Sequence, residues 1–600
     1  MKRLLLQMVL SFALLLATSG YAQTATEAEA FVVQAEKELA TYTTSASRMN
    51  WVNLTYITED TDALAAEFGA RGTEMSVRLA KDAAKFDKTK GLSFDVRRKL
   101  DFLKQSIVLP APQKPGAADE LNVIATRLQS SYGKGKGTLE GKPTNGSDIE
   151  EAMGIVRDPE KLKEMWTSWH DNVGTPMRDD YTRLVNIANE GAKELGYPDV
   201  GAMWRSGYDM PPEDFAREMD RLWLQVKPLY DQLHCYVRAK LHEHYGDKVQ
   251  PATGPIRADL LGNMWAQEWG NIYPLVAPKG VGDVGYDLTA LLLAKQYDPL
   301  KMVKAGEGFY TSLGLPALPT TFWERSMFTK PADREVVCHA SAWDIDNIND
   351  LRIKMCIKVN GDDFVVIHHE LGHNYYQRAY NQQPFLYLNG AHDGFHEAIG
   401  DFIALSITPE YLVQIGLLDA TNVPSADKDI GLLLRQALDK VAFLPFGLLM
   451  DKWRWEVFNG NTKPADYEKV WTNLRLKYQG IVPPGERPAT AFDPGAKYHI
   501  PGNTPYARYF LARILQFQFY QAAAKQVGWK GPLHRCSFYG DKGVGDRLNK
   551  MLAMGAAKPW PDALEAFTGS RQMDGAAMIA YFQPLMKWLE EQNKGRQTGW

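Results

Sequence analysis

The stretch His369-Glu370-Leu371-Gly372-His373 decides how the chain folds around its site. Residues four apart lie on the same face of a helix, so His369 and His373 can direct two imidazoles at one cation. Glu370 lies beside that pair, where its carboxylate can take a proton from a water on the metal. Such a site needs a third protein ligand and an open position for water. The pattern therefore predicts a zinc-binding helix that also carries the general base of a hydrolase.

A second motif, His396-Glu397-Ala398-Ile399-Gly400-Asp401, places Glu397 24 residues after His373. Glu397 and Asp401 are four residues apart and so share one helix face. One of them can ligate a metal while the other accepts the free ring N–H of a ligand histidine, which fixes the tautomer of that ring. The residues alone leave open which carboxylate does which. Together the two motifs favour a zinc hydrolase over a helix that carries two histidines by coincidence.

Both motifs lie in segments with helical periodicity. Asp362 and Asp363 suit the N-cap and first turn of the first helix, and Thr408-Pro409 suits the end of the second. Apolar residues at three- and four-residue spacing mark a buried face on each helix: Phe364, Ile367, Leu371 and Tyr375 on the first, and Phe395, Ile399, Phe402 and Ile403 on the second.

Length and composition are those of an ordinary globular protein. The 600-residue chain has a net charge of −4 and an isoelectric point near 6.3, which gives no basic surface for nucleic acid or an anionic membrane. Helical periodicity dominates residues 26–107 and continues from residue 149 to Trp600. Residues 108–148 are rich in Pro, Gly and Lys, and we interpret them as an exposed loop or, alternatively, as a hinge between domains.

Residues 1–22 have the pattern of a signal peptide. Lys2 and Arg3 form a charged end, residues 4–17 an apolar run, and Gly20-Tyr21-Ala22 a cleavage site of the small-x-small type. The apolar run is short for a membrane anchor. We therefore expect an exported protein, periplasmic or secreted, with no stable membrane anchor.

Four cysteines are few for an exported chain of this length. Cys338 and Cys356 lie 18 residues apart and could close a small loop upstream of the metal-binding helix, worth roughly 3 kcal/mol if the geometry permits. Cys235 and Cys536 have no obvious partner, and could be two buried thiols or a long-range bridge.

A peptidase also needs a donor for the oxyanion and a cation for the carboxylate at a peptide's C-terminus. Such groups are dense in residues 497–509, which read Lys-Tyr-His-Ile-Pro-Gly-Asn-Thr-Pro-Tyr-Ala-Arg-Tyr. Taken alone, Lys497 and Arg508 would more often be solvated surface charges.

Together these segments closely resemble the angiotensin-converting enzyme family of zinc peptidyl-dipeptidases. The resemblance covers nearly all of residues 23–600. Besides the two motifs above, it rests on residues 261–267, 336–344, 474–480, 493–497 and 531–534. Several long, unrelated motifs in one order make the resemblance specific.

The resemblance implies an all-α zincin fold, a helical clamshell of two subdomains around a deep channel. Zinc should lie at the base of the channel, and the helices of residues 26–107 should form a lid. The family fold is self-contained, so we expect a monomer.

The resemblance also assigns roles by motif. His369, His373 and Glu397 should hold zinc, Glu370 should act as general base and then acid, and Asp401 should accept from a ligand histidine. Substrate should be held by three groups of residues: His499 and Tyr509 on the oxyanion, His339 and the Ala340 backbone on the main chain, and Gln267, Lys497 and Tyr506 on the C-terminal carboxylate.

Members of the family are commonly activated by chloride, and the pattern survives here in part. Arg508 and Tyr208 match the anion site nearer the zinc, while Arg475 and Trp471 match a second site. In that second site His170 replaces a further arginine, and a mostly neutral imidazole offers less charge than a guanidinium. We therefore expect chloride at one site at least.

Two other positions depart from the family pattern. Ala524 stands where a partner for Cys536 is expected, so only the bridge between Cys338 and Cys356 carries over. Arg513 stands where an aromatic residue is expected near the pocket for the released dipeptide. This arginine predicts a preference for acidic or polar C-terminal residues.

The sequence thus predicts an exported zinc peptidyl-dipeptidase that acts on oligopeptides with a free C-terminus. Gln267 favours release of a dipeptide, because the family's carboxypeptidase relatives carry a longer, cationic arginine there. A zinc carboxypeptidase and a catalytically silent peptide-binding homologue are the alternatives. The silent homologue predicts a damaged metal triad or loss of Glu370, and this sequence has neither.

Overall fold

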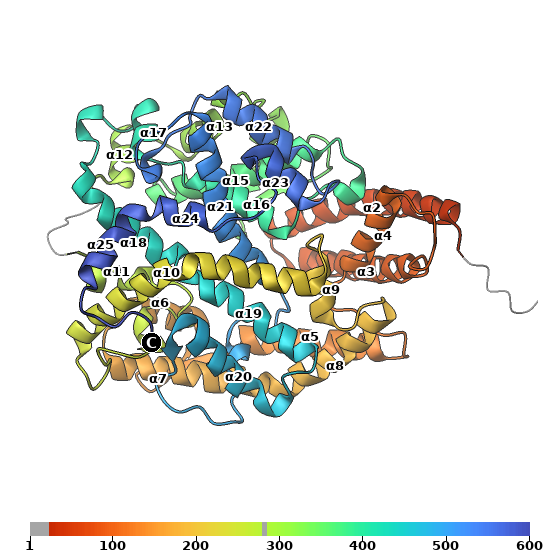
Figure 1. Ribbon diagram of the computed structural model, residues 1–600. Coiled ribbons are helices and arrows are strands. Elements are labelled where there is room, and N and C mark those ends of the chain that lie inside the picture. The colour runs from red at the N-terminus through yellow and green to blue at the C-terminus, as the bar shows by residue number, and fades with distance from the viewer. Residues whose placement is uncertain (1–22, 279–284) are drawn as a thin grey trace, which may run out of the picture.

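The computed structural model describes residues 23–278 and 285–600. The predicted signal peptide, residues 1–22, lies outside them. Within the described residues the fold is mainly helical (Figure 1), which confirms the predicted all-α class. None of the described helices combines the length and the hydropathy that a membrane crossing requires.

Three N-terminal helices project from one side of the body (Figure 1): α2 (Ala25–Thr55), α3 (Glu59–Ala84) and α4 (Phe94–Gln105). These match the helices expected in residues 26–107. Their apolar side chains form a core of their own, in which Val32, Leu79 and Leu100 are almost fully buried. Arg98 joins this unit to the body, because its Nε donates to the Ala556 carbonyl at 2.8 Å. That these helices act as a lid stays a prediction.

The long helix α10 (Pro212–Tyr245) crosses the body between two groups of helices (Figure 1). The group below it in this view contains α5 (Ala117–Gly133), α6 (Gly146–Ile155), α7 (Pro159–Trp169), α8 (Arg178–Glu194), α19 (Phe443–Phe458) and α20 (Tyr467–Leu474). The group above it contains α12 (Leu288–Ala294), α13 (Pro299–Ser312), α15 (Gly361–Tyr380), α16 (Asp393–Ala404), α17 (Pro409–Gln414), α21 (Ala507–Gln526), α22 (Lys542–Leu552) and α23 (Trp560–Thr568).

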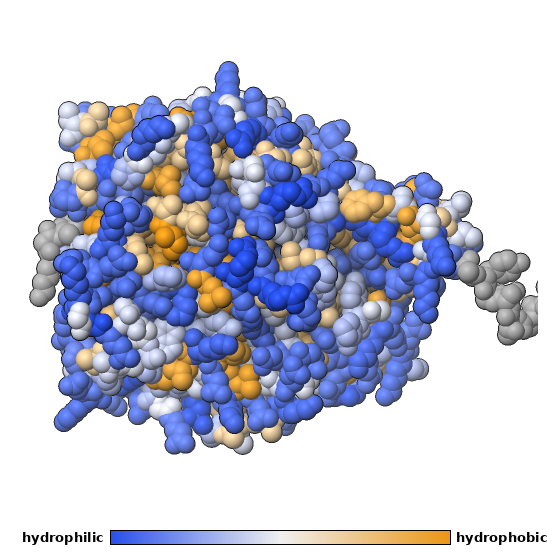
Figure 2. Space-filling view, viewed as in Figure 1, coloured by the Kyte–Doolittle hydropathy of each residue, from blue (hydrophilic) through white to orange (hydrophobic). Residues whose placement is uncertain are grey.

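Six further helices complete the set in the described residues: α9 (Val200–Ser206), α11 (Tyr273–Val276), α14 (Thr320–Arg325), α18 (Asp429–Lys440), α24 (Ala576–Tyr581) and α25 (Gln583–Gln592). One continuous hydrophobic core runs through both groups of helices; it includes Leu184 of α8 and Phe364 of α15. The two halves therefore share one interior. The outer face shown in Figure 2 is mostly hydrophilic, with apolar side chains in small separate patches.

The interpretation of residues 108–148 as an exposed loop or hinge is wrong. This stretch contains α5 and the antiparallel hairpin of β1 (Lys136–Leu139) and β2 (Lys142–Asn145). Leu121, Ile124 and Leu128 of α5 follow at helical spacing and are buried. The Pro and Gly residues that flank the helix hid this short apolar stripe.

Two further pairs of strands lie in the described residues. β3 (Ile256–Arg257) pairs in parallel with β6 (Ile481–Val482). β4 (Ser341–Asp344) pairs antiparallel with β5 (Leu351–Lys354), with Ser341 opposite Lys354. This second pair packs against α15, so it lies beside the metal-binding motif.

The two predicted helices form, with small corrections at their ends. The N-cap of α15 is Asn360, whose side chain accepts from the Asp363 N–H at 2.7 Å; Asp362 and Asp363 lie in the first turn. Helix α16 ends at Ala404, and Thr408 instead caps α17. Asn, Asp and Thr are all good caps, so composition alone does not choose among neighbouring candidates. All eight residues of the predicted apolar faces are buried.

Candidate active site

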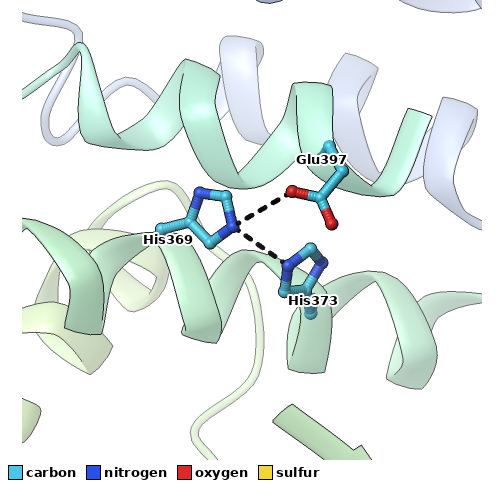
Figure 3. Close-up of side chains that lie close together, drawn as sticks. All are labelled: His369, His373 and Glu397. Atoms are coloured by element: carbon cyan, nitrogen blue, oxygen red, sulfur yellow. Dashed lines mark hydrogen bonds and ion pairs between the residues drawn. The ribbon is translucent and has the colours of Figure 1, made fainter. Parts of the chain in front are cut away.

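His369, His373 and Glu397 converge on one point between α15 and α16 (Figure 3). The Nε2 atoms of His369 and His373 lie 3.1 Å apart, and His369 Nε2 lies 3.7 Å from Glu397 Oε2. Two nitrogens at 2.0–2.1 Å from one tetrahedral zinc would be about 3.3 Å apart. The three side chains are partly buried and their ligand atoms all lie within 4.8 Å of one another. The residues therefore fit a zinc ion.

Asp401 lies on the other side of the His369 ring, in the place that the resemblance implied. Its Oδ1 lies 3.3 Å from His369 Nδ1, while its Oδ2 accepts from Arg513 at 2.7 Å and from Gln516 at 3.0 Å. Burial alone would raise the pKa of Asp401, but Lys440 and Arg513 outweigh it, so the pKa lies well below its usual range. The carboxylate is ionised and can orient the ring for a metal.

Two glycines allow α15 and α16 to approach closely enough for this site. A Cβ on Gly372 would lie 3.0 Å from the Cα of Gly400, and a Cβ on Gly400 would lie 2.7 Å from the His369 ring. Any side chain at Gly400 would thus displace a metal ligand. Both glycines stand inside the predicted motifs, but the spacing of those motifs predicts no role for them.

His396 lies behind the second histidine. Its Nδ1 is 3.4 Å from His373 Nδ1, and its Nε2 is 3.2 Å from the Tyr380 hydroxyl. Burial lowers the pKa of His396 to about 4, so its ring is neutral at pH 7. It can set the tautomer of His373 as Asp401 does for His369. His396 stands in the second motif, but its position there predicted no role for it.

Glu370 is 8% exposed and faces the same site. Burial raises its pKa, and the neighbouring histidine His369 opposes that rise. His339 is close enough to Glu370 to act on its charge. Lys354 Nζ fixes the segment before β4 by donating to the carbonyls of Val337 and His339.

The predicted carboxylate-binding residues also come together. The Tyr506 hydroxyl lies 3.4 Å from Gln267 Oε1, and Lys497 Nζ lies 3.8 Å from the centre of the Trp265 ring. Burial lowers the pKa of Lys497 to about 8, although Glu268 favours its charged form. A carboxylate brought to this ammonium would raise the pKa of Lys497 towards its usual value.

His499 links these residues to the metal site. Its ring centroid is 4.8 Å from that of Tyr506 and 5.7 Å from that of Tyr509. Burial, with Lys497 nearby, lowers the pKa of His499 to about 3, so the imidazole is neutral at pH 7. Tyr509 is close enough to Glu397 for the carboxylate to raise its pKa, with burial as the larger cause. Both side chains can therefore donate a hydrogen bond near the metal.

Arg508 and Tyr208, predicted to bind chloride, lie close together with a third group between them. Arg508 Nε is 3.1 Å from Asp393 Oδ2, and the Tyr208 hydroxyl interacts with the same carboxylate. No sequence motif predicted a role for Asp393. Chloride binding at Arg508 stays a prediction, and it must now account for a carboxylate already beside the guanidinium.

The second predicted anion site is built around Arg475. Its Nη2 donates to the Trp265 carbonyl at 2.5 Å, and its guanidinium lies 5.9 Å from the Trp471 ring. His170 stacks on Trp166 at 3.7 Å, and burial lowers its pKa to about 4. His170, which stands in place of the family's arginine, is therefore a neutral ring, as expected. A cavity of about 10 Å³ remains beside Arg475.

The structure pairs Cys338 with Cys356 in a disulfide, which confirms that prediction. Cys235 and Cys536 are buried free thiols, so the alternative of a long-range bridge between them is wrong. Burial raises the pKa of both thiols, which makes them poor nucleophiles.

Over residues 22–600 the chain matches a family model described as angiotensin-converting enzyme. The chain belongs to this family. It is 40% identical over 584 residues to the angiotensin-converting enzyme of Bos taurus, a match that covers 96% of this chain and 44% of the bovine protein. It is 40% identical over 570 residues to that of Haematobia irritans exigua, covering 92% of each chain. For Theromyzon tessulatum the identity is 44% over 456 residues, covering 76% of this chain and 73% of the relative.

These matches confirm the resemblance. The chain spans less than half the length of the bovine relative, but nearly the whole length of the relative from Haematobia irritans exigua. The family is a zinc peptidase family, and the geometry of His369, His373 and Glu397 agrees with it.

Substituting Gly400 should damage the metal site. In Gly400→Ala the new Cβ would meet the His369 ring, so we expect zinc affinity to fall by about tenfold or more. Competition with a chromophoric chelator measures this directly. Gly308→Ala is the matched control, because it is also helical and its new Cβ would meet nothing within 4 Å. Equal zinc affinity in the two variants would contradict the steric argument.

Removing the Arg513 guanidinium should also weaken zinc binding. Arg513→Met leaves Asp401 Oδ2 with Gln516 as its remaining hydrogen-bond donor and makes it easier for the carboxylate to turn away from His369, so we expect a loss of about 10–100-fold in zinc affinity. Arg571→Met removes an exposed ion pair with Asp562 and serves as control. If both variants bound zinc like the wild type, Arg513 would have no part in orienting the ligand.

Proposed function

We propose that the protein is a zinc peptidyl-dipeptidase that removes dipeptides from the free C-terminus of oligopeptides. One observation carries this proposal: a zinc triad with its general base faces a separate group of residues suited to a carboxylate. Gln267, Lys497 and Tyr506 form that group, and His499 lies between them and the metal site. Membership of the family supports the same activity.

The chain's own residues can supply the groups that peptide hydrolysis needs. When bound, zinc would polarise the scissile carbonyl and acidify a water. Glu370 would take a proton from the attacking water and pass it to the leaving amine, for which its raised pKa is suited. His499 and Tyr509 would donate hydrogen bonds to the oxyanion. His339 and the backbone of Ala340 would hold the substrate main chain.

The spacing between the metal site and the carboxylate group would determine the product. A C-terminus anchored at a fixed distance from zinc allows one bond only to reach the metal. Gln267 is neutral and shorter than the arginine of the carboxypeptidase relatives, so the anchor lies farther from the metal and favours a dipeptide. The carboxypeptidase and the silent homologue remain the alternatives to be tested.

Arg513 contributes less to specificity than its charge suggests. Its Nη1 donates to Asp401, and its Nη2 lies 3.5 Å from Asp439 Oδ1. Two carboxylates therefore balance its charge already. The preference for acidic or polar C-terminal residues stays a prediction, although Arg513 has little unpaired charge with which to attract them.

We also propose that a small anion such as chloride binds beside Arg475 and Trp471. Arg475 is buried, and the cavity next to it is about as large as the space that one water needs. The proposed protein is a monomer that is exported to the periplasm or secreted, and its partners are oligopeptides.

Product analysis tests the proposed activity. The zinc-loaded chain should release successive dipeptides from a decapeptide with a free C-terminus and leave its C-terminal amide intact, as followed by mass spectrometry. Glu370→Gln keeps the three ligands and should cleave the peptide roughly 10²–10⁴-fold more slowly. A loss of this size would show that the cleavage comes from this protein and is not due to a contaminating protease.

Each of the other outcomes would indicate a different function for the protein. Single amino acids would indicate a carboxypeptidase, and cleavage of the amide an endopeptidase. A chain that binds zinc but cleaves neither peptide would be the silent homologue.

Lys497 should produce an alkaline limit to activity. Its pKa of about 8 means that the ammonium loses its proton above this pH, and with it the attraction for a substrate carboxylate. We therefore expect kcat/KM to fall as pH rises through about 8. Lys497→Arg keeps its charge throughout, so its profile should extend to higher pH. Identical alkaline limbs in the two proteins would assign the titration to another group.

A further inference from the structure

The ion pair between Asp393 and Arg508 connects two helices of the active site. Asp393 is the first residue of α16, one turn before Glu397, and Arg508 is the second residue of α21, next to Tyr509. Arg508 Nε lies 3.1 Å from Asp393 Oδ2, and each side chain is about one-third exposed. The pair therefore joins the helix that carries a metal ligand to the helix that carries an oxyanion donor.

Asp393 is the carboxylate that pairs with Arg508, and Asp451 is the other carboxylate that acts on its charge. Asp451 also lines this region, but it accepts from the backbone N–H groups of Tyr506 and Ala507 at 2.7 Å each. It is also paired with Arg454. Asp451 is thus committed elsewhere, whereas Asp393 has its charge available for Arg508.

The pair lies at the wall of a cavity of about 510 Å³ between the body and the N-terminal helices. Leu39 and Phe102 line it from the side of the N-terminal helices, and Tyr208, Asp393 and Arg508 from the body. Asp393 Oδ1 is buried and makes no hydrogen bond within the described residues. An anion that approached Arg508 from this cavity would also meet the negative carboxylate of Asp393, which lines the same cavity.

We propose that Asp393 is a resident anion that takes the place of chloride beside Arg508. The inference rests on the proposed peptidase function. A chloride ion would neutralise Arg508 and bridge the helices only at concentrations near or above its Kd, whereas a tethered carboxylate does so at any salt concentration. The wild type should therefore have no need of chloride at this site, and losing the carboxylate should create that need.

The test compares the zinc-loaded full-length wild type with Asp393→Asn across a chloride series at constant ionic strength, with methanesulfonate as the replacing anion. Without chloride, kcat/KM of Asp393→Asn should be at least about tenfold below the wild type, because Arg508 has lost its partner. Added chloride should restore most of that loss. Asp562→Asn, which removes a surface partner of Arg571, should respond like the wild type.

The double variant Asp393→Asn/Arg508→Gln locates the ion. Chloride should no longer activate it, since both the carboxylate and the cation are gone. The comparison between variants also separates this site from Arg475, whose contribution is common to all of them. Equal chloride responses in the wild type and Asp393→Asn would overturn the proposal.

A binding measurement keeps the proposal testable if the proposed function fails. Chloride at constant ionic strength should raise the Tm of Asp393→Asn above its chloride-free value and do so less for the wild type. If no protein released dipeptides but this difference in Tm appeared, the resident anion would stand and the peptidase function would fall. Equal shifts in Tm would reject the resident anion whatever the activity.

Discussion

The packing of α15 against α16 at Gly372 and Gly400 is the constraint on which the metal centre depends. Two ligands come from one helix and the third from the other, so the distance between the helix axes sets whether all three reach one ion. Glycine at both positions removes the side chains that would separate the backbones. The ring of His369 then occupies the space above Gly400. The site is thus produced by close helix packing, with the ligands held as part of the core.

Helix α21 supplies the cations that keep this region electrically balanced. Arg508 pairs with Asp393 at the start of α16, and Arg513 pairs with Asp401 two turns later. A buried carboxylate left without a partner is costly, by about 3–5 kcal/mol in typical cases. The two arginines therefore fix the position of α16 along α21, and they also balance the charge of its two carboxylates. Tyr509 lies between them on the same helix, so its hydroxyl is placed by the same contacts.

The motif spacing predicted the pair His369 and His373 because four-residue spacing is a property of a single helix, whereas Glu397 was chosen over Asp401 only through the resemblance. Helical spacing predicted the apolar faces of α15 and α16 for the same reason. The partners of Asp401 could not be predicted from the sequence. Arg513 is 112 residues away along the chain, and only the fold brings the two together. Asp393 was overlooked because nothing local distinguishes it from a first-turn acid. Helix α5 was missed because Pro and Gly on either side outweighed its short apolar stripe.

Most apolar side chains of the N-terminal helices pack in a core apart from that of the body. Contact with the body is made by polar groups such as Arg98 and by a few apolar ones, among them Trp51, whose ring lies edge-on to that of Trp343. A change in the angle of this unit would leave most of its own interior buried and would alter mainly these contacts. Ion pairs at such a contact weaken as salt is added, whereas apolar contacts do not. If the unit acts as the predicted lid, admission of a peptide to the cavity beneath it would respond to the ionic composition of the medium through the polar part of the contact only.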